Sequence, residues 1–294
     1  NKKYFDILYK GAFICNFQAY KMIKRKIFIY PYFFRHVHNF FKKFSISKYE
    51  IKVLKSNGRD KNCLLIKNKT QIDFNNEELI EGKEQLLKNF NCNIDKDKIV
   101  YLCVRDQMYL SKTHPKQNWD YHSYRNWDIQ QFIPACEYLT KIGYKVFRMG
   151  KFANQKIKSD NPNIIDYANS DYRSDLLDLF IAKNSSFSIS TGVGIDDAAL
   201  LFRKPIAMIH LPFEFGNFFN NNLLMTRHHY SLSKKRNLNI SEIFAEGYKI
   251  NFHYSTQAYK DLQIKLLDNS TEEIKNFAYE MHLEISGNKK SDED

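Results

Sequence analysis

Hydrophobic and polar positions along the second half of the chain predict strands and helices in regular alternation. Lys98 to Val104 is an apolar run bounded by charged residues, which is typical of a strand buried on both faces of a parallel sheet. A helix is expected over 129–140, with Gly143 as its C-terminal stop, and a strand over 144–149. This succession predicts a βαβ unit.

The alternation continues toward the C-terminus. Further strands are expected over 164–166, 186–190, 205–210 and 264–267, and further helices over 175–182, 196–202 and from the capping box at 270–273 to about residue 285. Alternating elements of this length predict an α/β fold with a doubly wound, Rossmann-like parallel sheet.

The first third of the chain has a different pattern. A basic, aromatic segment runs from Tyr4 to Phe44, and Pro31 divides it into two expected helices. β-Prone runs at 49–54 and 63–67, separated by the turn residues Ser56-Asn57-Gly58, predict a small hairpin, and a helix is expected over 77–90. We therefore divide the chain into a partial, largely helical N-terminal region (1–95), a Rossmann-like domain (96–286) and a frayed tail (287–294).

Composition narrows the class of protein. With 43% hydrophobic and 15% aromatic residues but only 10 Gly and 6 Pro, the chain is neither disordered nor collagen-like. The five widely spaced cysteines suit a reducing compartment, and no apolar run approaches the roughly 18 residues of a membrane helix. A cytoplasmic location is expected, and the start at Asn1, without a signal-peptide pattern, suggests that an N-terminal part is missing.

The net charge of +12 suggests an anionic partner: nucleic acid, an anionic membrane surface or a phosphorylated small molecule. AT-rich coding also produces many Lys among Asn, Ile, Tyr and Phe. The segment from Tyr4 to Phe44 combines cations with aromatic rings, which suits a membrane interface, a helical pair packed on the protein or, less well, single-stranded nucleic acid.

The stretch Phe187 to Phe202 reads as a strand, a small glycine-containing loop and a helix. Such a loop lies at the carboxyl edge of a parallel sheet, where ligands bind, and glycine lets a diphosphate approach the backbone. Neither a dinucleotide fingerprint nor a Walker loop is present, since position 197 is Asp and no Gly-Lys-Ser/Thr occurs. The candidate donor-binding residues of this stretch are Ser190, Thr191, Gly192, Gly194 and Asp196, of which Asp196 could instead cap the helix.

Three arginines next to predicted strand ends or helix starts add positive charge to the same edge: Arg105, Arg148 and Arg173. Guanidinium groups bind phosphate oxygens in bidentate fashion, so their convergence favours an anion site. The further candidates nearby are Gly150, Lys151, Ser174 and Asp175, and Ser174 reads equally well as a helix N-cap.

The polar loop from Trp119 to Asp128 is rich in aromatic residues. It supplies candidate acceptor or sugar contacts, which could equally form a domain interface: Tyr121, Tyr124, Arg125 and Asn126. His122 and Asp106 are weak candidates for a catalytic base, and no His or Cys spacing indicates a metal site.

Several of these motifs, in order, resemble a bacterial glycosyltransferase family of surface-polysaccharide gene clusters. The motifs are Tyr-Arg-Asn-Trp-Asp128, Arg-Met-Gly-Lys151, Asp-Tyr-Ala-Asn-Ser170, Tyr-Arg-Ser-Asp175, Ser-Thr-Gly-Val-Gly-Ile-Asp196 and Phe-Arg-Lys-Pro205. The match covers about residues 98–287, and the glycine loop is similar in placement to the donor-binding half of GT-B enzymes such as heptosyltransferases and fucosyltransferases.

The resemblance implies the GT-B type, with this chain holding the nucleotide-sugar donor domain and only the end of the acceptor domain. It implies transfer of a sugar, hexosyl or deoxyhexosyl, from a nucleotide-diphosphate donor to a surface-glycan or lipid-linked acceptor. We expect this transfer to need no metal, because the cationic side chains and the helix at Gly194 can neutralise the leaving diphosphate; the cations are Arg105, Arg148, Lys151 and Arg173. No cofactor is expected, and peripheral contact with an anionic membrane is one further expectation. A noncatalytic module that binds nucleotide or anionic polysaccharide and a nucleic-acid-binding protein remain the alternatives.

Overall fold

The computed structural model describes residues 8–9, 14–41, 64–209, 222–247 and 256–287. Its main feature is a six-stranded sheet, all of whose strands are parallel, in the order β5-β4-β3-β6-β7-β8. The strands are β3 (Lys98–Cys103), β4 (Tyr144–Arg148), β5 (Ile164–Ile165), β6 (Ser185–Ser190), β7 (Ile206–Ile209) and β8 (Leu223–Met225). Chain order runs outward in both directions from the β3/β6 pair, so the predicted doubly wound, Rossmann-like sheet is confirmed.

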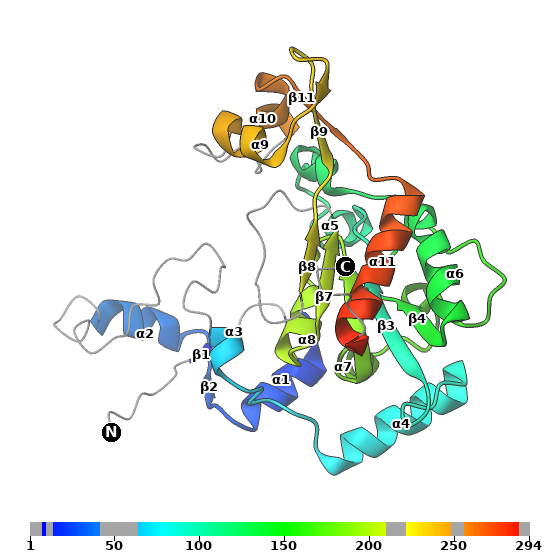
Figure 1. Cartoon of the computed structure of the whole chain (residues 1–294). Coiled ribbons are helices and arrows are strands. Elements are labelled where there is room, and N and C mark those ends of the chain that lie inside the picture. Colours follow the sequence, from blue (N-terminus) through cyan, green and yellow to red (C-terminus); the bar gives the residue numbers. More distant parts are fainter. Residues whose placement is uncertain (1–7, 10–13, 42–63, 210–221, 248–255, 288–294) are drawn as a thin grey trace.

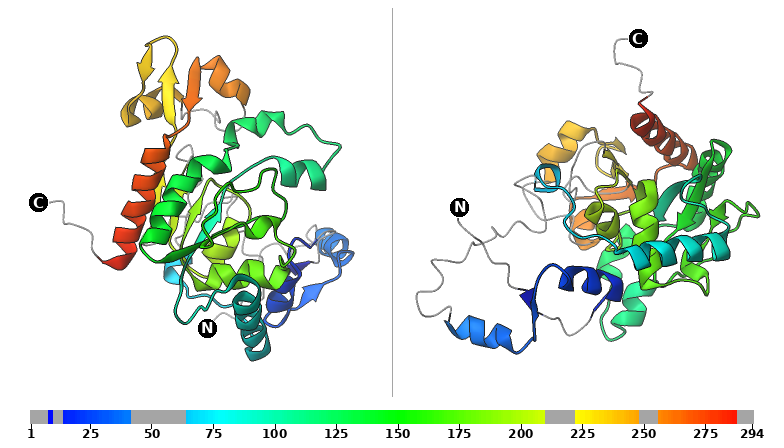
Figure 2. Two further views of the ribbon diagram at one scale, coloured as in Figure 1. Left: turned by 90° about the vertical axis from the view of Figure 1, so that its right-hand side faces the viewer. Right: turned by 90° about the horizontal axis from the view of Figure 1, so that it is seen from below.

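Helices cover both faces of this sheet (Figures 1 and 2). They are α5 (Met108–Thr113), α6 (Ile133–Lys141), α7 (Asp175–Asn184), α8 (Asp196–Leu201) and α11 (Thr271–Ser286), with 3-10 turns η2 (Asp120–Arg125), η3 (Ile129–Phe132) and η4 (Tyr167–Asn169). Alternate residues of β3 serve the two faces. Val100 and Leu102 lie in the core under α6 and α11, whereas Ile99 and Tyr101 lie in the core under α7.

The helix ends follow the sequence signals. Asn75 and Glu78 form a capping box at the start of α4 (Asn76–Phe90), and Ser270 and Glu273 form another at the start of α11. Gly143, at φ 93°, occupies the left-handed position just after α6, as expected for a helix stop.

The N-terminal region contains the two helices expected on either side of Pro31, α1 (Phe17–Lys24) and α2 (Phe34–Phe41), and a two-residue parallel pairing of β1 (Leu8–Tyr9) with β2 (Ile29–Tyr30). The strand expected over 63–67 is wrong, because Leu64–Lys67 forms one helical turn, α3. Residues 49–54 and the turn at 56–58 lie outside the described residues.

α1 and α4 both pack on α7, and Met22 and Leu86 are buried in the same core as Phe180. A Cβ atom added to Gly82 of α4 would lie 2.6 Å from the Phe180 ring, which shows how closely α4 approaches α7. Two elements that precede residue 95 thus share a core with the Rossmann-like sheet. The division of the chain at residue 95 stays a prediction.

A second, antiparallel sheet holds the strand expected over 264–267. It has the order β10-β9-β11, with β9 (His228–Ser231), β10 (Arg236–Asn237) and β11 (Ile264–Leu267), and it lies beside α9 (Ile240–Gly247) and α10 (Thr256–Asp261). The strand therefore does not extend the parallel sheet. Its Ile264 is buried with Leu238, Ile243 and Tyr259 in a small core of its own.

No helix within the described residue ranges is both long enough and apolar enough to span a membrane.

Candidate anion site at the switch point of the sheet

The loops that follow β3 and β6 meet at the point where the strand order reverses. The backbone N–H of Thr191 donates to the carbonyl of Cys103 at 3.0 Å. In return, the N–H of Arg105 donates to Thr191 Oγ1 at 2.8 Å. These bonds continue the β3/β6 pairing past the last strand residues and fix Arg105 against the glycine loop. A crevice at this position is where ligands bind in doubly wound sheets.

Buried side chains hold the glycine loop from below. Asp196 Oδ2 accepts from Ser190 Oγ at 2.6 Å and from the Val193 N–H at 2.8 Å, and Ser190 Oγ accepts from the Gly192 N–H at 2.9 Å. Gly192 has φ 78°, a left-handed conformation that favours glycine. Burial raises the pKa of Asp196 to about 7, although its two hydrogen bonds act against this shift.

This geometry alters three of the predicted donor contacts. Ser190, Thr191 and Asp196 are at most 5% exposed, and their side chains are turned inward to shape the loop. Direct contact of these side chains with a ligand therefore does not fit the structure. The helix that follows, α8, has six residues and carries Asp196 and Asp197 in its first turn, so the backbone of the loop at Gly192 and Gly194 remains as the part that a ligand could approach.

Arg105 and Arg125 lie together beside this loop, and we call them the arginine pair. Both side chains are half-buried, and among the described residues neither has a carboxylate within ion-pair distance. Burial, and after it the charge of Arg125, lowers the pKa of Arg105 to about 10, and its Nε atom is buried without a hydrogen-bond partner in the described part of the chain. Like charges held close together in a partly dry site are costly unless an anion joins them.

The loop that carries Arg125 is tied to both strand ends. Arg125 donates from Nη2 to the Gly192 carbonyl at 2.6 Å, and the Trp127 N–H donates to the Arg105 carbonyl at 3.0 Å. The sequence predicted that Arg148 and Arg173 would converge with Arg105 on this loop; the structure instead places Arg125, a predicted acceptor or sugar contact, beside Arg105 and the glycine loop. Whether these residues bind a ligand stays a prediction.

A residue that the sequence did not single out fixes the position of this loop. Arg227, between β8 and β9, donates to the carbonyls of Tyr124 at 2.6 Å and Asn126 at 2.8 Å, and its guanidinium lies 4.3 Å from the centre of the Trp127 ring. Its Nε lies 3.1 Å from Asp268. Arg227 is 7% exposed, yet nothing in the local sequence marks it, since its partners lie about 100 residues earlier or 41 residues later.

The aromatic residues of the same loop lie close to the arginine pair. The hydroxyls of Tyr124 and Tyr121 act on the pKa of Arg105, which places both near its guanidinium. The Tyr124 ring contacts Tyr259 of α10 at 5.4 Å, whereas the Tyr121 ring is 46% exposed. Asn126 Oδ1 is buried without a hydrogen-bond partner in the described ranges. The side chain of His122 lies outside what the structure describes.

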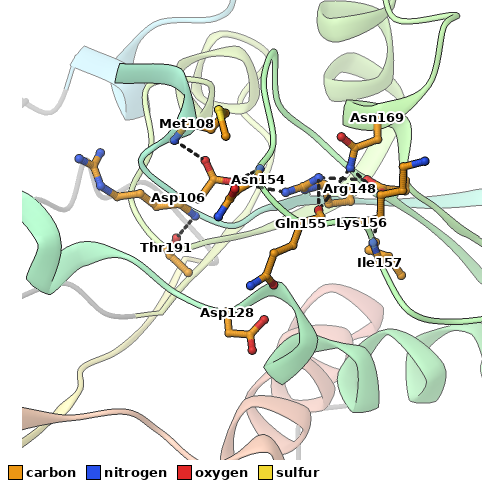
Figure 3. A network of polar contacts seen from close by, with 12 residues as sticks. Asp106, Met108, Asp128, Arg148, Asn154, Gln155, Lys156, Ile157, Asn169 and Thr191 are labelled. Carbon is orange, nitrogen blue, oxygen red and sulfur yellow. Dashed lines mark hydrogen bonds and ion pairs between the residues drawn. The ribbon is translucent and has the colours of Figure 1, made fainter. Parts of the chain in front are cut away.

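Arg148 and Asp106 form an ion pair with each other. This pairing does not fit the predicted roles of Arg148 in donor binding and of Asp106 as a base. Arg148 is 2% exposed; it lies 3.1 Å from Asp166 and 3.6 Å from Asp106. Asp106 also accepts the backbone N–H groups of Met108 and Asn154, each at 2.9 Å, and Figure 3 shows its side chain directed at Arg148 and Asn154. A buried cation between two carboxylates holds loops together and has no charge left for a phosphate. Asp106 in turn is poorly placed to act as a free base.

Arg173, Ser174 and Asp175 also have structural partners. Arg173 pairs with the buried Asp178, and Ser174 caps α7 by accepting the Leu177 N–H at 3.1 Å. Asp175 accepts the Phe17 N–H at 2.7 Å and so joins α1 to α7. These contacts replace the predicted role in donor binding. The sequence shows these residue types, but it does not show that Arg173 and Asp175 already have partners within the fold.

Gly150 and Lys151 follow β4. Gly150 has φ 150°, which favours glycine, and a Cβ atom there would lie 3.4 Å from Cβ of Ala168. Lys151 is half-buried. Their contribution to a ligand site stays a prediction.

Within the described residues, no group of three or more His, Cys, Asp and Glu side chains could hold a metal ion. Two hollows in the described part of the chain are lined by neither Arg105 nor Arg125. One of about 480 Å³ is lined by residues of 226–229 and 238–243, and one of about 600 Å³ lies between α1 and α4. We place the site by chemistry and topology, because an anion needs convergent cations at a strand edge more than it needs a deep cavity.

No protein-family model and no curated protein sequence matches this chain. Among solved structures it is similar to a protein described as the glycosyl transferase family 9 from Veillonella parvula DSM 2008, with 14% sequence identity and a TM-score of 0.43. The similarity covers 72% of this chain and 53% of that one, so this chain spans about half the length of the solved glycosyltransferase that it resembles.

Proposed function

We propose that the chain is the donor-binding part of a glycosyltransferase that uses a nucleotide-diphosphate sugar. The observation that carries the proposal is the half-buried pair Arg105 and Arg125, which stands beside the Gly192 loop at the switch point without a carboxylate partner among the described residues. A diphosphate is the ligand whose charge and size suit two adjacent guanidinium groups. The motifs that resemble a glycosyltransferase family are the reason to propose that this diphosphate carries a sugar.

The chemistry follows from the charges. When an acceptor hydroxyl attacks the anomeric carbon, its oxygen bonds to that carbon and its proton passes to the solvent. The bond from the carbon to the diphosphate oxygen breaks, and the nucleoside diphosphate leaves with one more negative charge. Arg105 and Arg125 would stabilise that charge, which is an electrostatic contribution of the kind that dominates in many enzymes. The two guanidinium groups could do this without a metal.

A noncatalytic nucleotide-binding module is the second candidate, and one observation favours it. Asp106, a predicted base, is held by Arg148 and by two backbone N–H groups. A binding module would retain the arginine pair but would not turn over a sugar donor.

The decisive experiment is a binding panel of UDP, GDP, CDP, ADP and CMP, followed by hydrolysis and transfer assays with the sugar derivative of the nucleotide that binds. A ligand at about 100 times its dissociation constant should add roughly 2.7 kcal/mol to the free energy of unfolding, a rise of several degrees in the melting temperature. Stabilisation by one nucleoside diphosphate, lost in Arg105→Gln, is the result that we expect.

Stabilisation by none of the five, or unchanged stabilisation in Arg105→Gln, would overturn the site. Binding without release of the sugar from any donor would favour the noncatalytic module.

A further inference from the structure

An exposed group of aromatic side chains lies on the N-terminal region, far along the chain from the arginine pair. We call it the aromatic patch, and its members are Phe28, Tyr30, Tyr32, Phe33, Phe34 and Phe40. Phe28 is 69% exposed, Phe33 60% and Phe40 58%. Exposed rings gathered this densely, in contrast to single exposed apolar residues, mark an interaction surface.

Several rings of the patch contact one another. Phe33 and Phe34 have ring centroids 4.5 Å apart, and Phe28 and Tyr30 have theirs 4.7 Å apart. Within the described residues, α2 packs closely on no other helix or strand, and Figure 1 shows it standing clear of the sheet and its covering helices. The patch therefore belongs to a projecting element.

α2 has two chemically different sides. At helical spacing Phe34, Val37 and Phe40 fall on one side and Arg35, His36 and Asn39 on the other, with His38 at the border between them. A short helix with Phe on one side and cations on the other suits the boundary between lipid headgroups and acyl chains.

The charge around the patch is of one sign. No Asp or Glu occurs between Asp6 and Glu50, whereas Lys24, Arg25 and Lys26 end α1 and Arg35 lies on α2. Arg25 is paired with Glu78, whereas the other three have no carboxylate of the described ranges within ion-pair distance, and all four are exposed. A protein surface that meets another protein needs no such exclusion of carboxylates over more than forty residues. Attraction to an anionic bilayer accounts for it, because each carboxylate near such a surface would be repelled.

We infer that the aromatic patch and the cations beside it form a docking surface for an anionic lipid bilayer, with the rings entering the headgroup layer and the cations contacting the lipid phosphates. This inference is independent of the proposed transfer reaction. It rests on the exposure of the rings, the two-sided helix and the acid-free sequence around them.

Sedimentation with lipid vesicles tests the inference. The chain should bind vesicles of phosphatidylcholine with about 30% phosphatidylglycerol at least ~10-fold more tightly than pure phosphatidylcholine vesicles, and less tightly as salt rises. The variant Phe28→Ser/Phe33→Ser/Phe40→Ser should lose at least ~10-fold in affinity for the anionic vesicles, because it removes the three most exposed rings. The charge variant Lys24→Gln/Lys26→Gln/Arg35→Gln should lose the preference for phosphatidylglycerol.

A matched control removes exposed apolar side chains from elsewhere on the molecule. Ile80, Tyr172 and Leu232 are 58%, 55% and 55% exposed, and their triple replacement by Ser should leave vesicle binding unchanged. Circular dichroism of each variant checks that the fold is intact.

Equal losses in the aromatic and control variants, or no binding of the unaltered chain to anionic vesicles, would overturn the inference. So would tighter binding to a single-stranded oligonucleotide than to the vesicles, or a patch-dependent dimer in gel filtration.

Discussion

At the scale of single residues, the decisive property of each arginine is the presence or absence of a carboxylate beside it. Arg148 and Arg105 both follow strands of the same sheet, and the sequence gives no reason to treat them differently. In the structure Arg148 is enclosed by Asp106 and Asp166, whereas Arg105 has Arg125 as its neighbour. The same substitution should therefore change stability much more at Arg148 than at Arg105.

Replacing Arg148 by Gln should lower the free energy of unfolding by about 3 kcal/mol, because it leaves two partly buried carboxylates without their cation. Replacing Arg105 by Gln should change stability by less than about 1 kcal/mol, since it removes a desolvated charge next to a like charge. Urea denaturation of the two variants measures the difference. Equal destabilisation would mean that Arg105 has a structural partner.

Asp196 should make stability depend on pH. Its pKa of about 7 in the folded chain lies above the ordinary value of 3.8 for an Asp carboxyl, so the folded chain holds this proton where the unfolded chain has lost it. This contribution is fully present below about pH 4 and is lost as the pH rises toward 7, with a slope on the order of 1.4 kcal/mol per pH unit. Asp178, with a pKa of about 6, acts in the same direction.

The Asp196→Asn variant should flatten this dependence between pH 4 and 7 while keeping the loop, because the amide oxygen can still accept from Ser190 and Val193. Denaturation curves at several pH values provide the check. A slope identical to that of the unaltered chain would show that Asp196 is ionised in the folded state.

At the scale of elements, two glycines are needed for different reasons, one for its backbone conformation and the other for close packing of two helices. Gly192 shapes the loop between β6 and α8, and Gly82 brings α4 onto α7. The sequence showed the first as a loop glycine, but it gave the second no role, because the contact of Gly82 with Phe180 joins residues 98 positions apart.

Gly192→Ala should cost about 1–2 kcal/mol of stability and weaken nucleotide binding, because alanine is strained at φ 78°. Gly143→Ala is the matched control, since Gly143 is also in the left-handed region, at φ 93°, but lies between α6 and the start of β4 and not in the glycine loop. Calorimetric titration with the nucleotide that binds compares the two variants. Equal affinities would remove the loop from the site.

Gly82→Ala should destabilise the fold by about 1–3 kcal/mol although alanine is the better helix former by about 1 kcal/mol, because the new methyl group overlaps the Phe180 ring. In a Phe180→Leu background the same change should cost less, and a double-mutant cycle by urea denaturation measures this coupling. Independent effects of the two substitutions would contradict the close packing of α4 on α7.

At the scale of the whole molecule, the sequence predicted the elements of the parallel sheet and missed the contacts between distant elements. Buried apolar runs such as Lys98–Cys103 reveal themselves locally. The small antiparallel sheet does not, because its strands are short and β9 pairs with β11 more than thirty residues later. For the same reason, ion pairs such as Arg148 with Asp166 could not be anticipated from residue types and spacing.

The shared core of α1, α4 and α7 predicts that the N-terminal region and the Rossmann-like sheet unfold together. Met22→Ala should lower the free energy of unfolding by about 2–4 kcal/mol, as for other buried side chains. The earlier unfolding transition should be visible in the fluorescence of Trp119 and Trp127, because both tryptophans lie after residue 96. Phe17→Ala is the control, since Phe17 is 58% exposed. An unchanged fluorescence transition in Met22→Ala would show that the region up to residue 95 unfolds by itself.

The hydrogen bonds from Arg227 to the carbonyls of Tyr124 and Asn126 connect the arginine pair to the antiparallel sheet. Thermodynamic linkage is reciprocal. An anion that stabilises the Arg125 loop must also stabilise β9 and β11, and a substitution that destabilises that sheet must weaken binding of the anion. Amide hydrogen exchange in residues 228–231 and 264–267 should therefore slow when a nucleotide binds, and those backbone groups would report occupancy of a site whose arginine pair and glycine loop lie on other elements.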